Sequence, residues 1–513
     1  MPVKAPKTSR HLELERKFDV VESTVSPSFE GIAAVAHVEK SPTQSLDATY
    51  FDTPTQDLAR NKITLRRRTG GTDAGWHLKL PAGPDARTEI RAALEASGPA
   101  GQDAVPSELL DVVLAIVRNR PVEPVARITT ERESQVLYSA DGTALAEFSN
   151  DHVTAWSAGA FEGLGSGPAD QEWREWELEL VESNGSADTE LLGRLSNRLL
   201  DAGAAPAAHA SKLARVLGAT SQPNGTRLPV DPVHRAVAEQ VNELLVWDRA
   251  VRADADDAVH QMRVTIRKLR SLLGDSQDSF GSSDTAWILE ELRELGNVLG
   301  AARDAEVLGE RYRLASDRLP PELVRGRVRE RLVDGARHRY QTGLRRSLMA
   351  MRSQRYFRLL DALDTVVAET PATASGKERP PVTIDAAYKK VRKAAKAAAQ
   401  VAGDVPGAEH ERDLALHRIR KRAKRLRYTA AAIGATQVSE QAKVIQTLLG
   451  DHQDSVVSRE HLSHQAEVAH AAGEDTFTYG LLYQQEADLA ESCRERLDDA
   501  LCRLTKSVRK ARH

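Results

Sequence analysis

The sequence predicts an α+β domain built mainly from antiparallel strands, followed by an all-α domain, and three observations carry this prediction. The first 220 residues contain short segments of alternating apolar and polar residues, separated by Gly- and Pro-rich turns. From about Asp231 the chain is rich in Ala, Leu, Arg and Glu, as helices are. Two pairs of similar segments recur there in the same order, which indicates an internal duplication.

The composition excludes several protein classes. Of the 513 residues, 41% are apolar, 28% charged and 4% aromatic, which is typical of a globular protein and not of a collagen, a disulfide scaffold or a membrane protein. The chain has no apolar leader and no run of 18 apolar residues, so we expect a cytoplasmic protein. Cys493 and Cys502 are nine residues apart, about 13 Å along a helix, so we expect reduced thiols.

The net charge of −3 is the sum of two unlike parts. Residues 1–220 hold 32 acidic and 23 basic residues, a balance of −9, whereas the remainder holds 42 and 48, a balance of +6. This asymmetry indicates that the two parts have separate tasks.

The first domain is expected to span residues 8–218. Helices are predicted over Pro106–Val117 and Asp188–Ala202, and Gly70-Gly71 and Asp141-Gly142 are among the turn signals. The predicted strands include His11–Val20, Ile63–Arg68, Trp76–Leu80, Arg87–Ala93, Arg127–Leu137, Ala144–Phe148 and Glu172–Glu182.

A polar linker over residues 219–230 leads to a helical domain over residues 231–513. A Pro- and Ser/Thr-rich segment, residues 369–383, splits this domain into halves of about 231–368 and 384–513. His260–Arg270 aligns with His417–Arg427 without a gap, and Leu299–Asp304 aligns with Leu449–Asp454. We therefore expect two helical bundles related by approximate two-fold symmetry.

Charged residues alternate along several strands of the first domain, and alternate residues of a strand share one face. Such faces are commonly exposed to solvent. The alternative is a closed barrel with a polar interior, where carboxylates hold divalent cations and Arg and Lys hold a polyanion, as phosphoryl hydrolysis requires. The sets that share a face are Glu13, Glu15 and Lys17; Arg66 and Arg68; Arg87, Glu89 and Arg91; and Glu177 and Glu179.

These residues resemble the CYTH domains, the triphosphate tunnel metalloenzymes, over roughly residues 8–218. Glu13-x-Glu15-x-Lys17 is similar to the signature of that family, and an ordered series of further matches follows it. The series is Tyr50–Thr53, Leu65–Arg68, Trp76–Pro81, Arg87–Glu89, Thr130–Arg132, Glu147 with Asp151, Glu177–Glu179, and Ser211-Lys212.

The resemblance implies an eight-stranded antiparallel tunnel that binds triphosphate and Mg²⁺ or Mn²⁺. It assigns catalysis to Glu13, Glu15, Lys17, Glu177 and Glu179. The implied metal ligands are Glu13, Glu15, Glu177 and Glu179, with Glu147, Asp151 and Glu89 as secondary candidates. The implied triphosphate ligands are Lys17, Arg66, Arg68, Lys79, Arg87, Arg132 and Lys212. Arg127 is a further candidate, but it differs in parity from Arg132, so we expect only one of the two to face inward. For the same reason we expect Arg67 to point outward.

The family includes inorganic triphosphatases, thiamine triphosphatases and adenylate cyclases. The sequence offers no evident aromatic pocket for thiamine or adenine, which favours inorganic triphosphate, although four Trp residues lie in this domain. The organic triphosphates remain alternatives. A further alternative is a polyphosphate-binding protein whose tunnel binds without turnover.

The repeated helices carry basic stripes without acidic residues. His260, Arg263, Arg267 and Arg270 fall within about 80° of a helix, and His417, Arg420, Lys424 and Arg427 repeat the pattern. A basic helix face is commonly solvated, but such faces usually alternate with acidic residues. Concentrated positive charge is relieved by a polyanion.

This region resembles a CHAD domain, a fold of two four-helix bundles with conserved histidines that binds inorganic polyphosphate. The resemblance implies polyphosphate binding by His260, Arg263, Arg267, Lys268, Arg270, His417, Arg420, Lys421, Lys424, Arg425 and Arg427. It would also bring the protein to polyphosphate granules. His452 has no counterpart in the first repeat, and Asp304 and Asp454 are expected to orient basic neighbours. The stripes lack interleaved aromatic residues and known DNA-binding motifs, which argues against nucleic acid. The sequence does not fix the oligomeric state.

Overall fold

The structure is a computed structural model. It describes residues 8–94, 104–157, 171–181, 189–218, 232–275, 282–368, 384–401, 408–432 and 434–511. The predicted linker 219–230 and the segment 369–383 lie outside the described residues. The chain divides into two compact units, Met1–Glu294 with Leu348–Ala372, and Leu295–Ser347 with Thr373–His513. Each unit is described by itself below.

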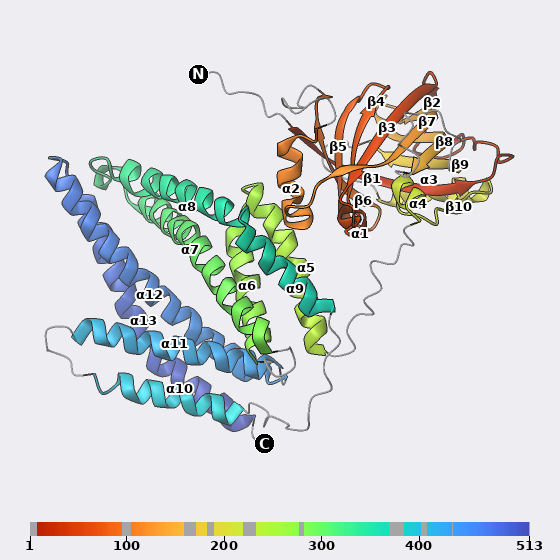
Figure 1. Cartoon of the computed structure of the whole chain (residues 1–513). Helices are drawn as coiled ribbons and strands as arrows, with labels where there is room; N and C mark the ends of the chain where they lie inside the picture. Colours follow the sequence, from red (N-terminus) through yellow and green to blue (C-terminus); the bar gives the residue numbers. More distant parts are fainter. Residues whose placement is uncertain are drawn as a thin grey trace, which may run out of the picture. The chain divides into compact units, whose positions relative to one another are not determined.

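The first domain is a closed antiparallel barrel of eight strands, as predicted (Figure 1). Strand β9 pairs with β1 and so closes the ring, which removes the exposed edges of an open sheet. Short strands β2 (His37–Lys40) and β10 (Ala205–Pro206) add to β7 and β1. Around the ring the strands are β1 (Thr8–Val20), β6 (Ala86–Ala92), β5 (Gly75–Gly83), β4 (Thr64–Thr69), β3 (Gln44–Asp52), β7 (Glu123–Tyr138), β8 (Ala144–Ser157) and β9 (Gln171–Leu180).

Strand β8 is longer than the predicted Ala144–Phe148 and continues to Ser157. Its polar residues Asn150, Asp151 and His152 conceal the alternation in the sequence. They remain in the strand because β8 pairs with β7 on one side and β9 on the other along most of its length. Pairing with neighbours thus outweighs local propensity here.

Helices cover the outer wall of the barrel and explain its apolar outer face. Helix α2 (Ser107–Val117) packs on Trp76, Leu78 and Ile90 of β5 and β6. Helix α3 (Thr189–Asp201) packs on Phe148, Trp176 and Leu178 of β8 and β9. Since successive side chains alternate across a strand, the residues between these apolar ones point into the barrel.

Two short helices complete the domain. Helix α1 (Asp57–Arg60) follows β3, and the buried Asp52 carboxylate accepts hydrogen bonds from the main-chain N–H groups of Leu58 and Ala59. Helix α4 (Lys212–Val216) brings Leu213 and Val216 into an apolar cluster with residues of β3, β7 and β8. The same short helix therefore anchors Lys212, one of the predicted site residues.

The first half of the helical part comprises α5, α6, α7 and an interrupted helix, α8 with α9. Only Arg352 and Ser353 separate α8 from α9. A 3₁₀ turn over Pro321–Leu323 and a π-helical turn over Glu330–Asp334 precede α8. The bounds are α5 Pro232–Arg252, α6 Ala258–Asp275, α7 Ser282–Arg318, α8 Gly335–Met351 and α9 Gln354–Ala368.

The second half is a four-helix bundle (Figure 1). Its core contains Ile419, Leu426, Ile445, Leu497 and other apolar residues from all four helices. The helices are α10 (Ile384–Ala398), α11 (Ala408–Ala432), α12 (Thr436–Ala471) and α13 (Phe477–Lys510).

The predicted repeats occupy equivalent helices. The two basic stripes lie on α6 and α11, and the two Leu-Gly segments lie in the middle of the long helices α7 and α12. Within the described residues, no helix combines the length and the apolar character needed to cross a membrane.

Candidate functional site

The inner wall of the barrel gathers the charged residues that strand alternation selects. Glu13 and Glu15 of β1 are 4% and 8% exposed, although both are carboxylates, because cations inside the barrel surround them. Lys17, two residues further, forms ion pairs with Glu15 and Glu177. The other predicted tunnel residues on inward-facing strand positions or at the barrel end are Arg66, Arg68, Lys79, Arg87, Glu89, Arg132, Glu147, Asp151, Glu179 and Lys212.

Three carboxylates lie side by side across three neighbouring strands. Glu179 of β9 stands opposite Glu15 of β1 on one side and opposite Glu147 of β8 on the other. Directly opposed residues in a sheet have Cβ atoms about 5 Å apart, so like charges in such a row repel. We call Glu15, Glu147 and Glu179 the carboxylate row.

Two carboxyl groups on this side of the barrel, those of Glu179 and Glu13, have raised pKa values. Burial raises the pKa of Glu179 to about 7, and the negative charges of Glu13, Glu15 and Glu177 add to the rise against the opposing effect of Lys79. Burial also raises the pKa of Glu13. A divalent cation would relieve this excess of negative charge, and carboxylate oxygens are its preferred ligands. In this structure Lys79 pairs with Glu13, and Lys17 and Arg87 pair with Glu15.

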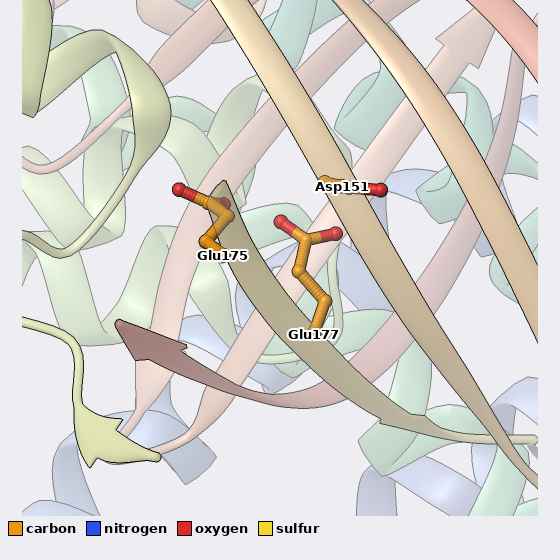
Figure 2. Close-up of side chains that lie close together, drawn as sticks. All are labelled: Asp151, Glu175 and Glu177. Carbon is orange, nitrogen blue, oxygen red and sulfur yellow. The ribbon is translucent and has the colours of Figure 1, made fainter. Parts of the chain in front are cut away.

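A second group of carboxylates consists of Asp151, Glu175 and Glu177. Figure 2 shows Glu175 and Glu177 on one strand and Asp151 on its neighbour. One oxygen of each lies within 4.8 Å of the others, a spacing that could hold a metal ion. In this structure the Nζ atom of Lys212 is 2.9 Å from Asp151, 2.7 Å from Glu175 and 2.7 Å from Glu177. The Lys212 ammonium group thus neutralises this group.

Helix α4 holds Lys212 in place through its own cap and its apolar side. The Ser211 hydroxyl accepts a hydrogen bond from the main-chain N–H of Ala214, as an N-cap residue does. Leu213 and Val216 anchor the helix in the apolar cluster described above. Although burial opposes it, the three carboxylates hold the pKa of Lys212 well above its usual value, so the side chain stays charged.

Glu177 is the carboxylate at which the cations of the tunnel converge. Besides Lys212, it forms ion pairs with Lys17 and with Arg132, whose Nη2 lies 2.5 Å away. Arg132 also binds Asp151 through two hydrogen bonds of 2.8 and 2.7 Å. Burial would raise the pKa of Glu177, but these three cations outweigh burial and hold the pKa well below its usual range. Glu177 is therefore ionised and fixes the positions of Lys17 and Arg132.

Arg66, Arg68 and Arg132 bring their positive charges together on β4 and β7. Burial, together with the neighbouring Arg66 and Arg132, lowers the pKa of Arg68 to about 9. The ion pair of Arg68 with Asp73 only partly offsets this repulsion. We call Arg66, Arg68 and Arg132 the cationic wall, and an anion between these side chains would relieve it.

Arg66 and Arg68 of the cationic wall lie on the side of the barrel opposite the carboxylate row. In the ring of eight strands, β4 is four strands away from β9 in either direction. Arg66 and Arg68 therefore stand across the interior from Glu179, with Lys17 and Arg132 bound to Glu177 between them. The interior thus has a carboxylate side and a cationic side.

A third group links β1, β5 and β6. Lys79 Nζ lies 2.5 Å from Glu13 and 3.8 Å from Glu89, and Arg91 pairs with both carboxylates. Arg87 Nε lies 3.0 Å from Glu15. Burial would raise the pKa of Glu15, but the charges of Lys17, Lys79 and Arg87 outweigh burial and lower it to about 2.

Sequence reasoning missed three interior residues: Tyr50, His77 and Glu175. Glu175 continues the alternation of Glu177 and Glu179 by two residues, so the same parity argument would have found it. His77 shares the face of Lys79 in the same way. The Tyr50 hydroxyl accepts a hydrogen bond from Arg66 Nη1 at 3.3 Å, and this pairing depends on the register of β3 with β4.

The parity prediction for Arg127 is confirmed. Its guanidinium group donates to Asp47 at 2.7 and 3.1 Å and lies over the ring of Trp156. Asp47 pairs with residues of β4 and β7 at positions that alternate with the inward-facing ones. Arg67 has the parity of Leu65, which belongs to the cluster under α2.

In the second unit, the basic stripe of α11 is half-buried. His417, Arg420, Lys424 and Arg427 are neither fully buried nor fully exposed. Arg427 donates to the side chain of Gln446 on α12 at 3.2 Å. Burial and the charges of Lys421 and Arg420 lower the pKa of His417, which indicates a strongly positive surrounding.

Gly450, in the Leu-Gly segment of α12, lies next to Arg420 of the stripe on α11. A Cβ atom at Gly450 would lie 3.6 Å from the Nε and Nη2 atoms of Arg420, so the glycine leaves room for the guanidinium group over α12. Burial raises the pKa of Asp454, and Arg311 and Arg420 oppose the rise. Asp454 therefore lies near Arg420, in agreement with the orienting role that we expected for it.

Three predicted polyphosphate ligands lie beside the stripes. Lys268, Lys421 and Arg425 are exposed and each follows a stripe residue by one position, which turns it by about 100° around the helix. In the first unit, His260 and Arg263 are half-buried while Arg267 and Arg270 are exposed.

Comparison with known proteins agrees with this architecture. The model of the CYTH domain family matches residues 11–195, and the model of the CHAD domain family matches residues 235–463. The uncharacterized protein MT2285 of Mycobacterium tuberculosis (strain CDC 1551 / Oshkosh) is 75% identical over 518 residues, which cover 100% of both chains.

Two solved structures are similar over about half of the chain. PptA from Streptomyces chartreusis has 19% identity and a TM-score of 0.43, covering 52% of this chain and 97% of its own. The CHAD domain from the plant Ricinus communis has 24% identity and a TM-score of 0.40, covering 52% of this chain and 90% of its own. With the family matches and the mycobacterial relative, the conclusion is that the chain belongs to the same family as that relative and joins a CYTH domain to a CHAD domain.

Proposed function

We propose that the tunnel domain hydrolyses inorganic triphosphate with Mg²⁺ or Mn²⁺ and that the helical domain binds polyphosphate. The observation that carries the first half is the separation of charge inside the barrel. Burial and the neighbouring Arg66 and Arg132 lower the pKa of Arg68, while burial and the neighbouring Glu13, Glu15 and Glu177 raise the pKa of Glu179. A phosphate chain together with a divalent cation would relieve both at once.

The arginines and the carboxylates of the tunnel have different roles in phosphoryl transfer. Arg66, Arg68 and Arg132 bind the equatorial oxygens of the chain, where negative charge concentrates in the transition state. Glu13 and the carboxylate row would hold the cation, which when bound would supply charge neutralisation and a more acidic water. Lys17, fixed by Glu15 and Glu177, holds the phosphate chain between the two sides.

The tryptophans of the domain support an inorganic substrate. Trp76 and Trp176 are fully buried under α2 and α3, outside the tunnel. Arg127 lies over Trp156, and Arg215 lies over Trp173 with its guanidinium carbon 4.7 Å from the ring centroid. A cation therefore already occupies one face of each of these two rings, which disfavours them as stacking partners for a thiazole, pyrimidine or adenine ring.

The basic stripe of α11 supports polyphosphate binding by the helical domain. Its cations are positioned by contacts with α12, as the Arg427–Gln446 hydrogen bond indicates, and the stripe holds no acidic residue. A row of positioned cations on one side of a helix favours a polyanion as its ligand. We infer a cytoplasmic protein that associates with polyphosphate granules through this domain.

The test is phosphate release by the purified full chain from tripolyphosphate, ATP and thiamine triphosphate, each with Mg²⁺ and with Mn²⁺. We expect the highest kcat/KM with tripolyphosphate and a loss of at least about 100-fold in Glu13→Ala. Arg127→Gln is the matched control, since Arg127 lies outside the tunnel. Absence of turnover with every substrate, together with intact Mn²⁺ binding, would favour a binding protein. A preference for ATP or thiamine triphosphate would reject the inorganic substrate.

A further inference from the structure

A basic surface separate from the half-buried stripe covers the outside of α10 and α11. Its members are all fully exposed. We call it the outer basic face, and it consists of Lys389, Lys390, Arg392, Lys393 and Lys396 of α10 and Arg418, Lys421, Arg422 and Arg425 of α11. These residues turn away from the core of the bundle, which Val391 and Ile419 enter from the other side of the same helices.

The helical period separates the outer basic face from the stripe. On α11 the four exposed cations fall within about 100° of the circumference, whereas Arg420 and Lys424 lie on the adjacent side toward α12. On α10 the five cations span about 160°. The two helices pack against each other, so their exposed sides adjoin (Figure 1).

The cations of the outer basic face lack the acidic partners that other exposed arginines have. Arg313, Arg327 and Arg503 each pair with a carboxylate three or four residues away on the same helical segment. Within the described residues, none of the nine members forms an ion pair with an acidic group. An unpaired cluster of this size costs self-repulsion, which a polyanion would relieve.

We infer that the outer basic face binds a second segment of the same linear polyphosphate chain that the stripe binds. This inference rests on the proposed function of the helical domain. A chain that leaves the stripe needs only to pass around α11 to reach the outer basic face. Two linked contacts raise the affinity for a polymer long enough to make both, and leave the affinity for a short one unchanged.

The chemistry of the surface favours polyphosphate over nucleic acid. Binding of single-stranded nucleic acid relies on aromatic rings that stack with bases. The neighbouring exposed aromatic residue, Tyr428, has its ring covered by the Arg427 guanidinium group, whose carbon is 5.6 Å from the ring centroid. The nine members themselves are all Lys or Arg, which suits a ligand made of phosphate alone.

The test measures binding of short and of long polyphosphate by the full chain at several salt concentrations. The outer variant carries Lys389→Gln, Lys393→Gln, Arg418→Gln and Arg422→Gln, and the control carries Arg313→Gln, Arg327→Gln and Arg503→Gln. For the outer variant we expect a loss of about tenfold or more for the long chain only. The slope of its logarithmic affinity against the logarithm of the salt concentration should become shallower by about three. Tripolyphosphate hydrolysis and the control's binding should equal those of the wild type.

Four outcomes would overturn the inference. Wild-type affinity of the outer variant for the long chain would mean that this surface binds no polymer. An equal loss for short and long chains would mean that it is not a separate segment. Competition by duplex DNA as strong, per charge, as that by polyphosphate would assign the surface to nucleic acid. If the wild type binds no polyphosphate at all, the proposed function of the helical domain is rejected together with this inference. The proposed hydrolysis in the tunnel is tested independently by phosphate release.

Discussion

A buried hydrogen bond joins His77 and Glu89 on the inner side of the tunnel. His77 Nδ1 lies 2.8 Å from Glu89 Oε1, and His77 Nε2 lies 2.9 Å from the main-chain oxygen of Asp73. A neutral imidazole has one N–H, but here both nitrogens face acceptors. Burial opposes it, but the hydrogen bond from His77 and the charge of Lys79 hold the pKa of Glu89 well below its usual range. Glu89 is therefore an ionised carboxylate that His77 holds in place.

Removal of His77 should destabilise the tunnel domain. His77→Phe leaves the buried Glu89 without one of its hydrogen bonds, at a cost of about 2 kcal/mol in the free energy of unfolding. The double variant His77→Phe with Glu89→Gln should lose about 1 kcal/mol less stability than the sum of the losses of the two single variants. Denaturant unfolding measures both. His152→Phe is the control, since His152 is exposed on β8, and should stay within about 0.5 kcal/mol of the wild type.

The cationic wall should govern substrate affinity. Arg66→Gln and Arg68→Gln each remove charge-assisted hydrogen bonds to phosphate, so kcat/KM for tripolyphosphate should fall by about 10–100-fold. Steady-state kinetics should show this for both variants and leave Arg127→Gln unchanged. Equal effects of the inward-facing and the outward-facing arginines would contradict the assignment of the wall.

Metal binding should depend on pH through Glu179. Its pKa of about 7 means that the side chain holds a proton in slightly acidic solution, and a cation must displace this proton. Affinity for Mn²⁺, measured by calorimetry, should therefore rise with pH up to about 7 and then level off. Glu179→Gln should remove this dependence and lower the affinity. A wild-type affinity that is constant between about pH 5 and 8 would count against Glu179 as a ligand.

The same shift predicts the direction of a stability change without metal. The pKa of Glu179 is raised on folding from the ordinary 4.5 to about 7, so the folded state binds the proton more tightly than the unfolded state. Its favourable contribution is complete below pH 4.5 and disappears as the pH rises through 7. Glu179→Gln, which keeps the neutral form, should therefore raise the thermal midpoint of the metal-free protein at pH 8 more than at pH 5.

Strand alternation predicted most of the tunnel because a period of two determines which residues share a face. Glu13, Glu15, Lys17 and Glu179 all line the interior as expected. It could not predict that Lys212 neutralises Asp151, Glu175 and Glu177, since this contact joins positions 35 to 61 residues apart and depends on how α4 enters the barrel. Side-chain partners between distant strands follow from register and closure, which a local pattern does not contain.

The helical domain shows a different limit. The repeat located the basic helices correctly, but the sequence could not show that Arg420 and Lys424 are half-buried while Lys421 and Arg425 are exposed. The two sets differ in burial because α12 packs against one side of α11 and leaves the other exposed. The helical period of 3.6 residues distinguishes buried from exposed cations on α11 only when the side that packs against α12 is known.

Gly450 offers a test of the stripe that leaves its charges intact. A Cβ atom there would lie 3.6 Å from the Arg420 guanidinium group, an ordinary contact distance, so Gly450→Ala should preserve polyphosphate affinity and stabilise α12 by up to about 1 kcal/mol. Gly450→Leu places further carbon atoms where that guanidinium group lies, and should weaken binding about as much as Arg420→Gln. Titration with polyphosphate and thermal unfolding of both variants separate the two effects. Equal binding by the leucine and alanine variants would mean that Arg420 does not need its position over α12 to bind the polymer.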